Sequence, residues 1–428
     1  MMRFSRRRFL QVGSTAAAAA VVPATSSAEC SAKLPPSIAS LKSMKGQATP
    51  ISADERSARV EKARQLMEEN HLQAILVTNG NSLPYYSAVH WWPSERFFAM
   101  VLPAKGNAFF VCPAFEEGRA REQLVTGPFG AKVEIRTWQE DEDPYQRVAD
   151  GLHDLGVSSG VLGIEEKTPY VFSNGIASHL PAIQIASATP VTAGCRMVKS
   201  EHELGLMRLA SKVSITAYAA AYHALQPGMT GQEFEALVES AHTQLGFHGG
   251  ADAQVGEYSA TPHGSIQPQK IREGTIVMMD GGCSVEGYAS DISRTFVLGK
   301  PTAKMQQIFD VVYRAQSAAL AAARPGVACE SVDAAARKVV IDAGYGPGFK
   351  YFTHRVGHGM GLDGHEWPYL VPGNATPLRA DMVFSDEPGI YLPGEFGVRI
   401  EDDMHITSDG AELFTPRSPS LEHPFGNG

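Results

Sequence analysis

Two aspartates in one short stretch are placed as if to bind a metal ion. Residues 275–298 read TIVMMDGGCSVEGYASDISRTFVL, two apolar runs around a turn at Glu286–Gly287, which predicts a β-hairpin. If the register is symmetric about the turn, Asp280 and Asp291 face each other directly across the two strands. Two bare carboxylates would repel, so the pair requires a cation or a bound proton. An isolated pair of this kind more often only caps turns.

Three further residues complete a set of metal ligands. His358 lies in a glycine-rich run, where the backbone can pack closely and bring the imidazole toward a site. Glu387 and Glu401 each follow a predicted strand. Four carboxylates and one imidazole suit two divalent ions, Mn²⁺, Co²⁺, Fe²⁺ or Zn²⁺, bridged by carboxylates and a hydroxide. The expected metal ligands are Asp280, Asp291, His358, Glu387 and Glu401.

The elements that must position these ligands fall into two predicted domains. Residues 51–195 alternate short helices with short apolar strands, which is typical of a small α/β domain. The catalytic residues all lie in a second domain, residues 196–428, which begins with long helices. Expected strands are 74–77, 97–102, 108–112 and 161–164, and expected helices begin near 52 and cover 115–124 and 145–155.

The second domain contains an internal repeat. A helix over 201–225, a Pro-Gly pair and a helix over 231–245 are followed by a second such set, with helices over 305–323 and 329–343. Pro227 aligns with Pro325 and Gly228 with Gly326, at a constant spacing of 98 residues. One repeat of this length predicts a domain with pseudo-twofold symmetry, in which both halves supply ligands to a site between them.

Composition and the first residues indicate an exported globular protein. The 428 residues carry a net charge of −9 and no basic stripe, which argues against nucleic-acid binding. Residues 1–28 resemble a twin-arginine signal peptide, with SRRRFL followed by a short apolar run, and residues 29–50 have the composition of a linker. The apolar run is too short for a stable membrane anchor, so we expect export of the folded protein to the periplasm or beyond. The five cysteines are scattered and predict no disulfide framework or thiolate site.

The ordered motifs resemble the pita-bread metallopeptidase family in its aminopeptidase P and prolidase branch. DGGCSVEGYASDISRTF is similar to the family's two-aspartate hairpin, GHGMG to its histidine motif, and EPGIY and RIED to its two glutamate motifs. The upstream domain is similar to the creatinase-type N-terminal domain. The resemblance implies an α+β pita-bread catalytic domain, two divalent ions, most often Mn²⁺, on the five ligands, and a homodimer.

The same resemblance implies residues that handle the substrate. It places His263, His354 and Arg399 beside the substrate and puts His365 in contact with the scissile peptide. Glu387 would accept a proton from the water molecule that becomes the metal-bridging hydroxide. It would then pass this proton to the proline nitrogen. His365, with His263, would stabilise the tetrahedral oxyanion. The implied substrate is a peptide with proline at its second position, cleaved before that proline; Gly364 and Glu366 differ from the common pattern and leave the side-chain preference open.

Three other functions remain compatible with the sequence. A creatinase-like amidinohydrolase shares the fold but not the full ligand set, whereas all five ligands are present here. A metal-dependent lyase or a phosphotriesterase-like enzyme could use the same fold, because a fold does not fix a substrate. A non-catalytic binding module would be expected to have lost ligands.

Two adjacent tryptophans in the upstream domain allow two interpretations. Trp91 and Trp92 lie in a predicted loop, and one or both could pack into the core of the small domain. The family resemblance offers another role, because its upstream domain overhangs the catalytic cleft of the partner subunit. An apolar wall of that kind would limit the length of the substrate.

Overall fold

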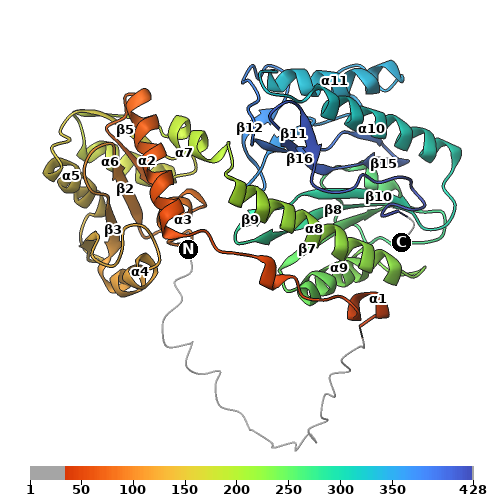
Figure 1. The fold of residues 1–428 in the computed structure, drawn as a ribbon, viewed down its shortest axis with the longest axis horizontal. Coiled ribbons are helices and arrows are strands. Elements are labelled where there is room, and N and C mark those ends of the chain that lie inside the picture. Colours follow the sequence, from red (N-terminus) through yellow and green to blue (C-terminus); the bar gives the residue numbers. More distant parts are fainter. Residues whose placement is uncertain (1–33, 427–428) are drawn as a thin grey trace, which may run out of the picture. The chain divides into compact units, whose positions relative to one another are not determined.

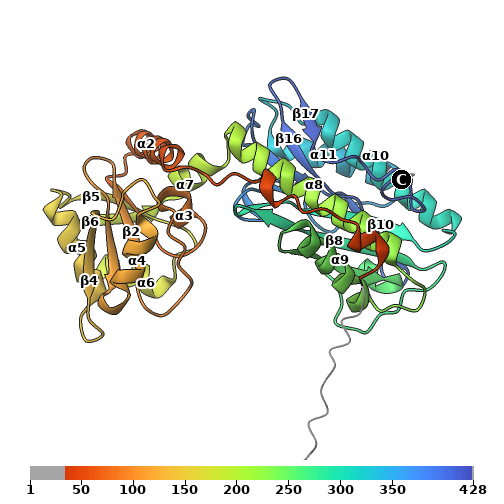
Figure 2. The ribbon, with the colours of Figure 1, turned by 60° about the horizontal axis from the view of Figure 1, so that its bottom comes forward.

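The computed structural model describes residues 34–426, so the expected signal peptide, residues 1–28, lies outside the described part of the chain. Within that part, two domains follow one another as the composition predicted (Figures 1 and 2). None of the described helices is both long and apolar enough to cross a membrane.

The N-terminal domain is a six-stranded sheet in the order β4-β3-β2-β1-β5-β6. Apolar clusters cover both faces of this sheet, which explains why β1 is a continuous apolar run with no alternation. The strands are β1 Ala74–Val77, β2 Ala99–Pro103, β3 Phe109–Pro113, β4 Glu134–Trp138, β5 Gly160–Ile164 and β6 Ile183–Ser187. The helices are α2 Ala53–Glu69, α3 Ser82–Ser87, α4 Glu117–Leu124, α5 Pro144–Asp154, α6 Tyr170–His179 and α7 Thr189–Arg196, with a 3₁₀ turn at Ala114–Glu116.

The sequence missed five elements of this domain, α3, β4, α6, β6 and α7. Strands β4 and β6 are the two edge strands, and their partly exposed side chains give no continuous apolar run. Helix α3 is short and contains Pro84, a residue that usually ends a helix.

In the catalytic domain, curved sheets lie between two helix pairs (Figures 1 and 2). One pair is α8 Glu201–Ala224 with α9 Gly231–Leu245, and the other is α10 Ala303–Ala322 with α11 Cys329–Asp342. The first sheet has the order β10-β8-β7, with β9 paired to β8, and the second has the order β12-β11-β13-β16-β17. The strands are β7 Gly249–Val255, β8 Ile276–Val285, β9 Tyr288–Ala289, β10 Ile292–Val297, β11 Gly357–Gly359, β12 Glu366–Leu370, β13 Val383–Asp386, β14 Gly389–Leu392, β15 Phe396–Arg399, β16 Asp402–Ile406 and β17 Ala411–Leu413, with a 3₁₀ turn at Gly256–Ala260.

The internal repeat is confirmed in the geometry of the two helix pairs. Gly228 and Gly326, which follow the repeated prolines, both have positive φ, +95° and +85°. The Gly228 amide donates to the Ile271 carbonyl at 2.8 Å, and the Gly326 amide donates to the Leu378 carbonyl at 2.8 Å. Each half therefore uses the same Pro-Gly turn to join its helix pair to the segment that precedes one of its strands, β8 in the first half and β13 in the second.

Residues 36–50 differ from the expected linker. They contain the short helix α1 Pro36–Ala39 and a 3₁₀ turn at Lys45–Gln47. Ile38 is completely buried in the same apolar cluster as Leu206 of α8, and the Ser37 hydroxyl donates to the Ala220 carbonyl at 2.8 Å. The polar composition of this segment hid the isoleucine that fixes it to the catalytic domain.

The predicted hairpin is present, but its register differs from the expectation. Val285 pairs with Tyr288 around the tight turn, and the same register places Asp280 opposite Ser293. Asp291 lies between β9 and β10, so the two aspartates are diagonal neighbours and do not face each other directly. They are offset by two residues, and the side chains still share one face of the hairpin because side chains alternate with a period of two.

Candidate active site

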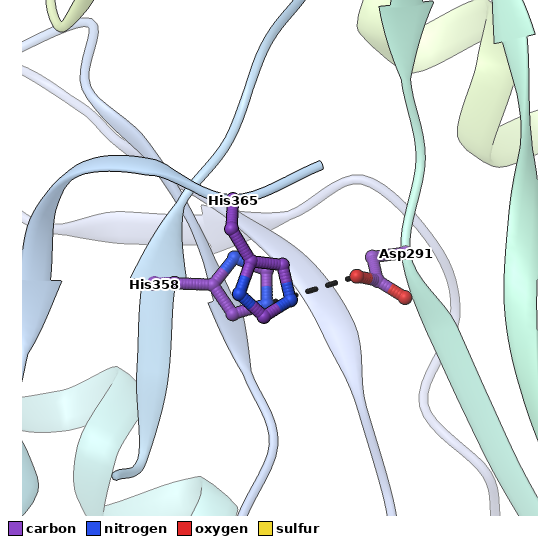
Figure 3. A group of neighbouring side chains, drawn as sticks. All are labelled: Asp291, His358 and His365. Atoms are coloured by element: carbon purple, nitrogen blue, oxygen red, sulfur yellow. Dashed lines mark ion pairs between the residues drawn. The ribbon is translucent and has the colours of Figure 1, made fainter. Parts of the chain in front are cut away.

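The five expected ligands come together from both halves of the catalytic domain. Asp280 lies on β8, Asp291 precedes β10, His358 lies on β11, Glu387 follows β13, and Glu401 lies between β15 and β16. Their ligand atoms form overlapping groups in which all atoms lie within 4.8 Å of one another. These groups are Asp280–Asp291–Glu401, His358–Glu387–Glu401 and Asp291–His358–His365, the last of which is drawn in Figure 3.

A glycine lets the histidine strand pack against its neighbour. A Cβ at Gly357, beside His358, would lie 2.0 Å from the Ser385 carbonyl oxygen, which no other residue could tolerate. The Ser385 hydroxyl accepts from the His358 amide at 3.0 Å and donates to Glu387 Oε1 at 3.1 Å. Ser385 therefore links the backbone of one ligand to the carboxylate of another, and the sequence analysis did not identify it.

His358 presents a free ring nitrogen to the carboxylates. Its Nδ1 lies 3.2 Å from the Gly359 carbonyl oxygen and donates to it, which leaves Nε2 as the acceptor. Nε2 lies 3.4 Å from Glu387 Oε1 and 3.7 Å from Asp291 Oδ2. Burial lowers the pKa of His358 to about 3, so the ring is neutral, as a metal ligand must be.

The carboxylates are too close and too buried to be charged together without a cation. Burial, with Asp280 as a neighbouring charge, raises the pKa of Glu387 to about 7. Burial raises the pKa of Asp291 well above its ordinary value, with a further contribution from Asp280, and burial together with Asp291 does the same for Glu401. Two divalent cations would remove this repulsion, and the hard oxygen-rich donor set fits them.

Asp280 is the exception, because it already has cationic and hydroxyl partners. Burial alone would raise its pKa, but Arg399 Nη2, 2.6 Å from Asp280 Oδ2, lowers it below the ordinary value. The Ser293 Oγ lies 2.7 Å from Asp280 Oδ1 and 2.6 Å from Glu401 Oε2. Ser293 thus connects two of the expected ligands. A hairpin register symmetric about Glu286–Gly287 places Ser293 opposite Asp280, and this pairing could have identified Ser293 from the sequence.

Arg399 occupies a different place from the one expected. The resemblance put it beside the substrate, whereas the structure buries it against the ligand cluster, with 2% of its side chain exposed. Its Nε donates to Ser293 Oγ at 2.8 Å and lies 3.8 Å from Glu401 Oε2. Its Nη1 donates to Tyr391 Oη and to the Pro262 carbonyl, both at 3.0 Å. The guanidinium therefore orients metal ligands as well as the loop that carries His263.

The three histidines expected beside the substrate have different surroundings in the structure. His354 Nε2 lies 2.7 Å from Tyr391 Oη, while its Nδ1 lies 2.8 Å from the Arg355 carbonyl oxygen and 3.8 Å from Glu387 Oε2. His365 is exposed and stacks on His358 with ring centroids 3.6 Å apart (Figure 3). His263 is exposed on the loop after the Gly256–Ala260 turn and borders a cavity of about 380 Å³.

Comparisons with known proteins agree with this architecture. Residues 59–198 match the creatinase/prolidase N-terminal domain, and residues 205–408 match metallopeptidase family M24. A probable dipeptidase PepE from Mycobacterium tuberculosis is 37% identical over 346 residues, which cover 79% of this chain and 89% of the relative. The chain belongs to metallopeptidase family M24. The predicted family, its two-domain fold and the prediction of a metallo-exopeptidase are confirmed.

Two further relatives extend the M24 assignment along the chain. An Xaa-Pro dipeptidase from Lactobacillus delbrueckii subsp. lactis is 32% identical and covers 85% of this chain and 98% of the relative. The crystal structure of dipeptidase PepE from Mycobacterium ulcerans has a TM-score of 0.81 and 34% identity, covering 87% of this chain and 99% of that one. Membership of M24 implies divalent metal ions, for which the grouped ligands offer the site.

Proposed function

We propose that this M24 enzyme is an Xaa-Pro dipeptidase that cleaves the bond before proline with two divalent ions bound to Asp280, Asp291, His358, Glu387 and Glu401. The observation that carries the proposal is that the five proposed ligands form two groups, Asp280–Asp291–Glu401 and His358–Glu387–Glu401, which share Glu401. Such sharing suits two adjacent ions better than one. Relatives named Xaa-Pro dipeptidase match this chain through 98% of their own length, which supports the choice of substrate.

The proposed reaction needs a water-derived nucleophile and a proton acceptor. Divalent ions bound at this site would act as Lewis acids and make water ionise near neutral pH. Glu387 is the proposed proton acceptor, because its carboxylate lies 3.8 Å from His354 Nδ1 and burial raises its pKa to about 7. Glu387 would then deliver this proton to the proline nitrogen, which leaves as a secondary amine.

The histidines expected beside the substrate would line the site and polarise the peptide. His365 is exposed at the surface, but its ring is partly buried, and this burial together with Arg355 lowers its pKa below the ordinary value. The ring is therefore neutral at pH 7 and can donate one N–H to the developing oxyanion. His354 is held by two hydrogen bonds, since its Nδ1 donates to the Arg355 carbonyl and its Nε2 accepts from Tyr391 Oη, and burial lowers its pKa to about 3. Its neutral ring would therefore line the peptide site without donating a hydrogen bond to the substrate. His263 would contribute from the opposite loop, where it borders the cavity described above.

The native metal, assembly and location are further parts of the proposal. We assign Mn²⁺ because the set is dominated by carboxylate oxygens, which manganese prefers over softer ligands.

The homodimer is supported by the exposed Trp92 and Phe115 on the N-terminal domain, 48% and 66% exposed, since large apolar side chains are often covered by a partner. Export by the twin-arginine route rests on residues 5–10, SRRRFL, and replacing both Arg6 and Arg7 by Lys should retain the protein in the cytoplasm.

A panel of dipeptides assayed after metal reconstitution tests the function. The apoenzyme should be loaded separately with Mn²⁺, Co²⁺ and Zn²⁺ and given Xaa-Pro dipeptides, Xaa-Pro-Xaa tripeptides and matched Xaa-Ala dipeptides. We expect proline release from the dipeptides to be fastest, with Mn²⁺ the best activator and two metal equivalents bound. Equal or faster cleavage of the Xaa-Ala dipeptides would contradict the assignment to proline.

A second candidate is a dipeptidase without a requirement for proline. The mycobacterial relatives at 37% identity are named as dipeptidases with no mention of proline, which favours this candidate. The Xaa-Ala arm of the same panel distinguishes the two, because the metal chemistry is shared and only the leaving group differs.

A further inference from the structure

His365 has no fixed partner of its own, which raises the question of what positions it. Among the described residues its ring makes no hydrogen bond and stacks only on His358. The segment that carries it, residues 362–366, is neither helix nor strand until β12 begins at Glu366. A histidine that must meet a developing charge needs its ring held to within a fraction of an ångström. The contacts on either side of His365 supply that constraint.

On its carboxyl side, His365 is followed by a buried ion cluster. Glu366 is 8% exposed, and its Oε1 accepts from Lys199 Nζ at 2.8 Å while its Oε2 pairs with Arg196 Nη2. Gly361 makes room for this contact, because a Cβ there would lie 2.7 Å from Glu366 Oε1 and 3.2 Å from Lys199 Cε. Burial alone would raise the pKa of Glu366, but Lys199 and Arg196 lower it, so the carboxylate is charged and fully paired.

On its amino side, the same segment is held by two loops of the N-terminal domain. Asn81 Nδ2 donates to the Leu362 carbonyl at 2.7 Å and to Asp363 Oδ1 at 3.0 Å, and Lys167 Nζ lies 3.0 Å from the same Oδ1. Asn81 follows β1 and Lys167 follows β5, which are adjacent parallel strands. Their carboxyl ends meet at one edge of the sheet, so the fold brings both loops to the same segment.

Arg196 joins the two sides. This residue ends α7, the last helix of the N-terminal domain, and its Nη2 contacts Asp363 Oδ2 at 2.6 Å as well as Glu366. One guanidinium therefore bridges the residues two before and one after His365. It is 9% exposed, so the ion pairs are shielded from solvent, and removing one partner would leave an uncompensated buried charge.

We propose that the N-terminal domain positions His365 through the 363–366 clamp, formed by Asp363 and Glu366 on the catalytic domain with Asn81, Lys167, Arg196 and Lys199. This rests on the proposed role of His365 in peptide cleavage. Among the described residues, the clamp side chains make no hydrogen bond or ion pair with a proposed metal ligand, so they are positioning residues. The N-terminal domain would thus control the substrate side of the site separately from its metal content.

A double-mutant cycle tests the clamp. Asp363→Asn keeps the shape of the side chain, which is 20% exposed, and weakens its pairs with Arg196 and Lys167. In the wild-type background it should lower kcat about 10-fold with KM within about threefold and both metals retained. In the His365→Ala background it should change kcat by less than about twofold, because the residue it acts through is gone. If the losses of kcat caused by Asp363→Asn and His365→Ala multiply in the double variant, the proposal is overturned.

Loss of a different ion pair between the two domains serves as the matched control. Arg59 of α2 pairs with Glu203 of α8 at 3.1 Å and donates to Tyr288 Oη at 2.8 Å, and both ionic side chains are less than 10% exposed. Arg59→Met should lower the melting temperature at least as much as Asp363→Asn and leave kcat within about twofold. A comparable loss of kcat would show that domain docking in general, and not the clamp, sets activity.

A readout without substrate separates the clamp from the proposed reaction. With ¹³C-labelled histidine and Zn²⁺ bound, the His365 ring signal is assigned by its absence in His365→Ala. Asp363→Asn should shift or broaden this signal and leave the His354 signal in place, and Arg59→Met should move neither. If the panel of Xaa-Pro peptides is not cleaved but the signal moves, the proposed function fails and the clamp stands. An unmoved signal with active enzyme would overturn the clamp alone.

Discussion

The proposed metal-ligand cluster and the proposed substrate-side histidines lie next to each other but are held in different ways. The cluster has a buried core, in which His358 and Glu401 are each 2% exposed, while the side chains of Asp280, Asp291 and Glu387 are 35%, 22% and 14% exposed. All five residues lie on or directly beside strands. His263 and His365 are exposed on loops. A metal site needs several donors fixed together, whereas a substrate site must stay open to a ligand that enters and leaves. Changes in the two regions should therefore have separable effects on metal content and on turnover.

The largest effect is expected inside the cluster. Asp291→Ala or Glu401→Ala removes a carboxylate donor from the cluster and should lower kcat/KM by about a thousandfold, with loss of at least one metal equivalent. Elemental analysis alongside Xaa-Pro hydrolysis measures both, with the exposed Asp310→Ala on α10 as control. Full metal occupancy in both ligand variants would contradict the assignment.

A substitution at Arg399 tests whether this residue acts on the metal site or on the substrate. Because its guanidinium contacts Asp280 and Ser293, Arg399→Met should weaken metal binding about 10- to 100-fold, as expected for a residue that orients ligands. Titration calorimetry of the apoenzyme with Mn²⁺ measures this directly. An unchanged affinity together with a raised KM would return Arg399 to the substrate side, where the sequence had placed it.

His354 should behave as a substrate-side residue. Its ring is held by Tyr391 and the Arg355 carbonyl, and it lies 3.8 Å from Glu387 without belonging to any of the ligand groups. His354→Ala should keep both metals and lower kcat/KM about 10-fold. His358→Ala is the comparison, since it should lose metal. Equal metal loss in the two variants would contradict the placement of His354 outside the metal site.

The pH dependence of the metal-free protein should contain a contribution from Glu387, which the Glu387→Gln variant separates from that of Asp403, whose pKa burial also raises to about 7. Burial raises the pKa of Glu387 from 4.5 to about 7, so between these values the folded state keeps a proton that the unfolded chain has lost. This contribution to stability is fully present below pH 4.5 and is lost as pH rises through 7. Urea unfolding of chelator-treated protein should show stability falling over this window, with a flatter profile for Glu387→Gln. A wild-type profile no steeper than that of the variant would contradict the shift.

The smallest effect is expected at the tryptophan pair. Trp91 is 7% exposed and stacks on Phe98 with centroids 4.0 Å apart, so it belongs to the core and Trp91→Ala should cost about 3–5 kcal/mol. Trp92 is 48% exposed and lies 3.7 Å beneath Arg119 in a cation–π contact. Trp92→Ala should leave the melting temperature within about 2 °C and change the ratio of dipeptide to tripeptide cleavage about threefold. An unchanged ratio would remove Trp92 from the substrate side.

The sequence by itself determined the types of ligand, their order along the chain and the repeat that brings them together. Helical periodicity, the Pro-Gly pairs and the glycines near His358 are local signals, because they depend on residues close together in the chain. Helix α9 was predicted to the residue, and α8, α10 and α11 to within two residues. The edge strands of the N-terminal domain were missed because they lack a continuous apolar run.

Only the tertiary structure decided which distant residues meet. Asp280 faces Ser293 and not Asp291, because the Val285–Tyr288 pair at the tight turn sets a register in which Asp291 lies two residues away from the position opposite Asp280. Arg399 lies on Asp280, Ile38 packs under α8, and one tryptophan of the pair is buried while the other is not. The clamp around His365 joins residues more than 160 positions apart, as from Arg196 to Asp363. Such contacts follow from packing between elements, whose geometry no local pattern of residues records.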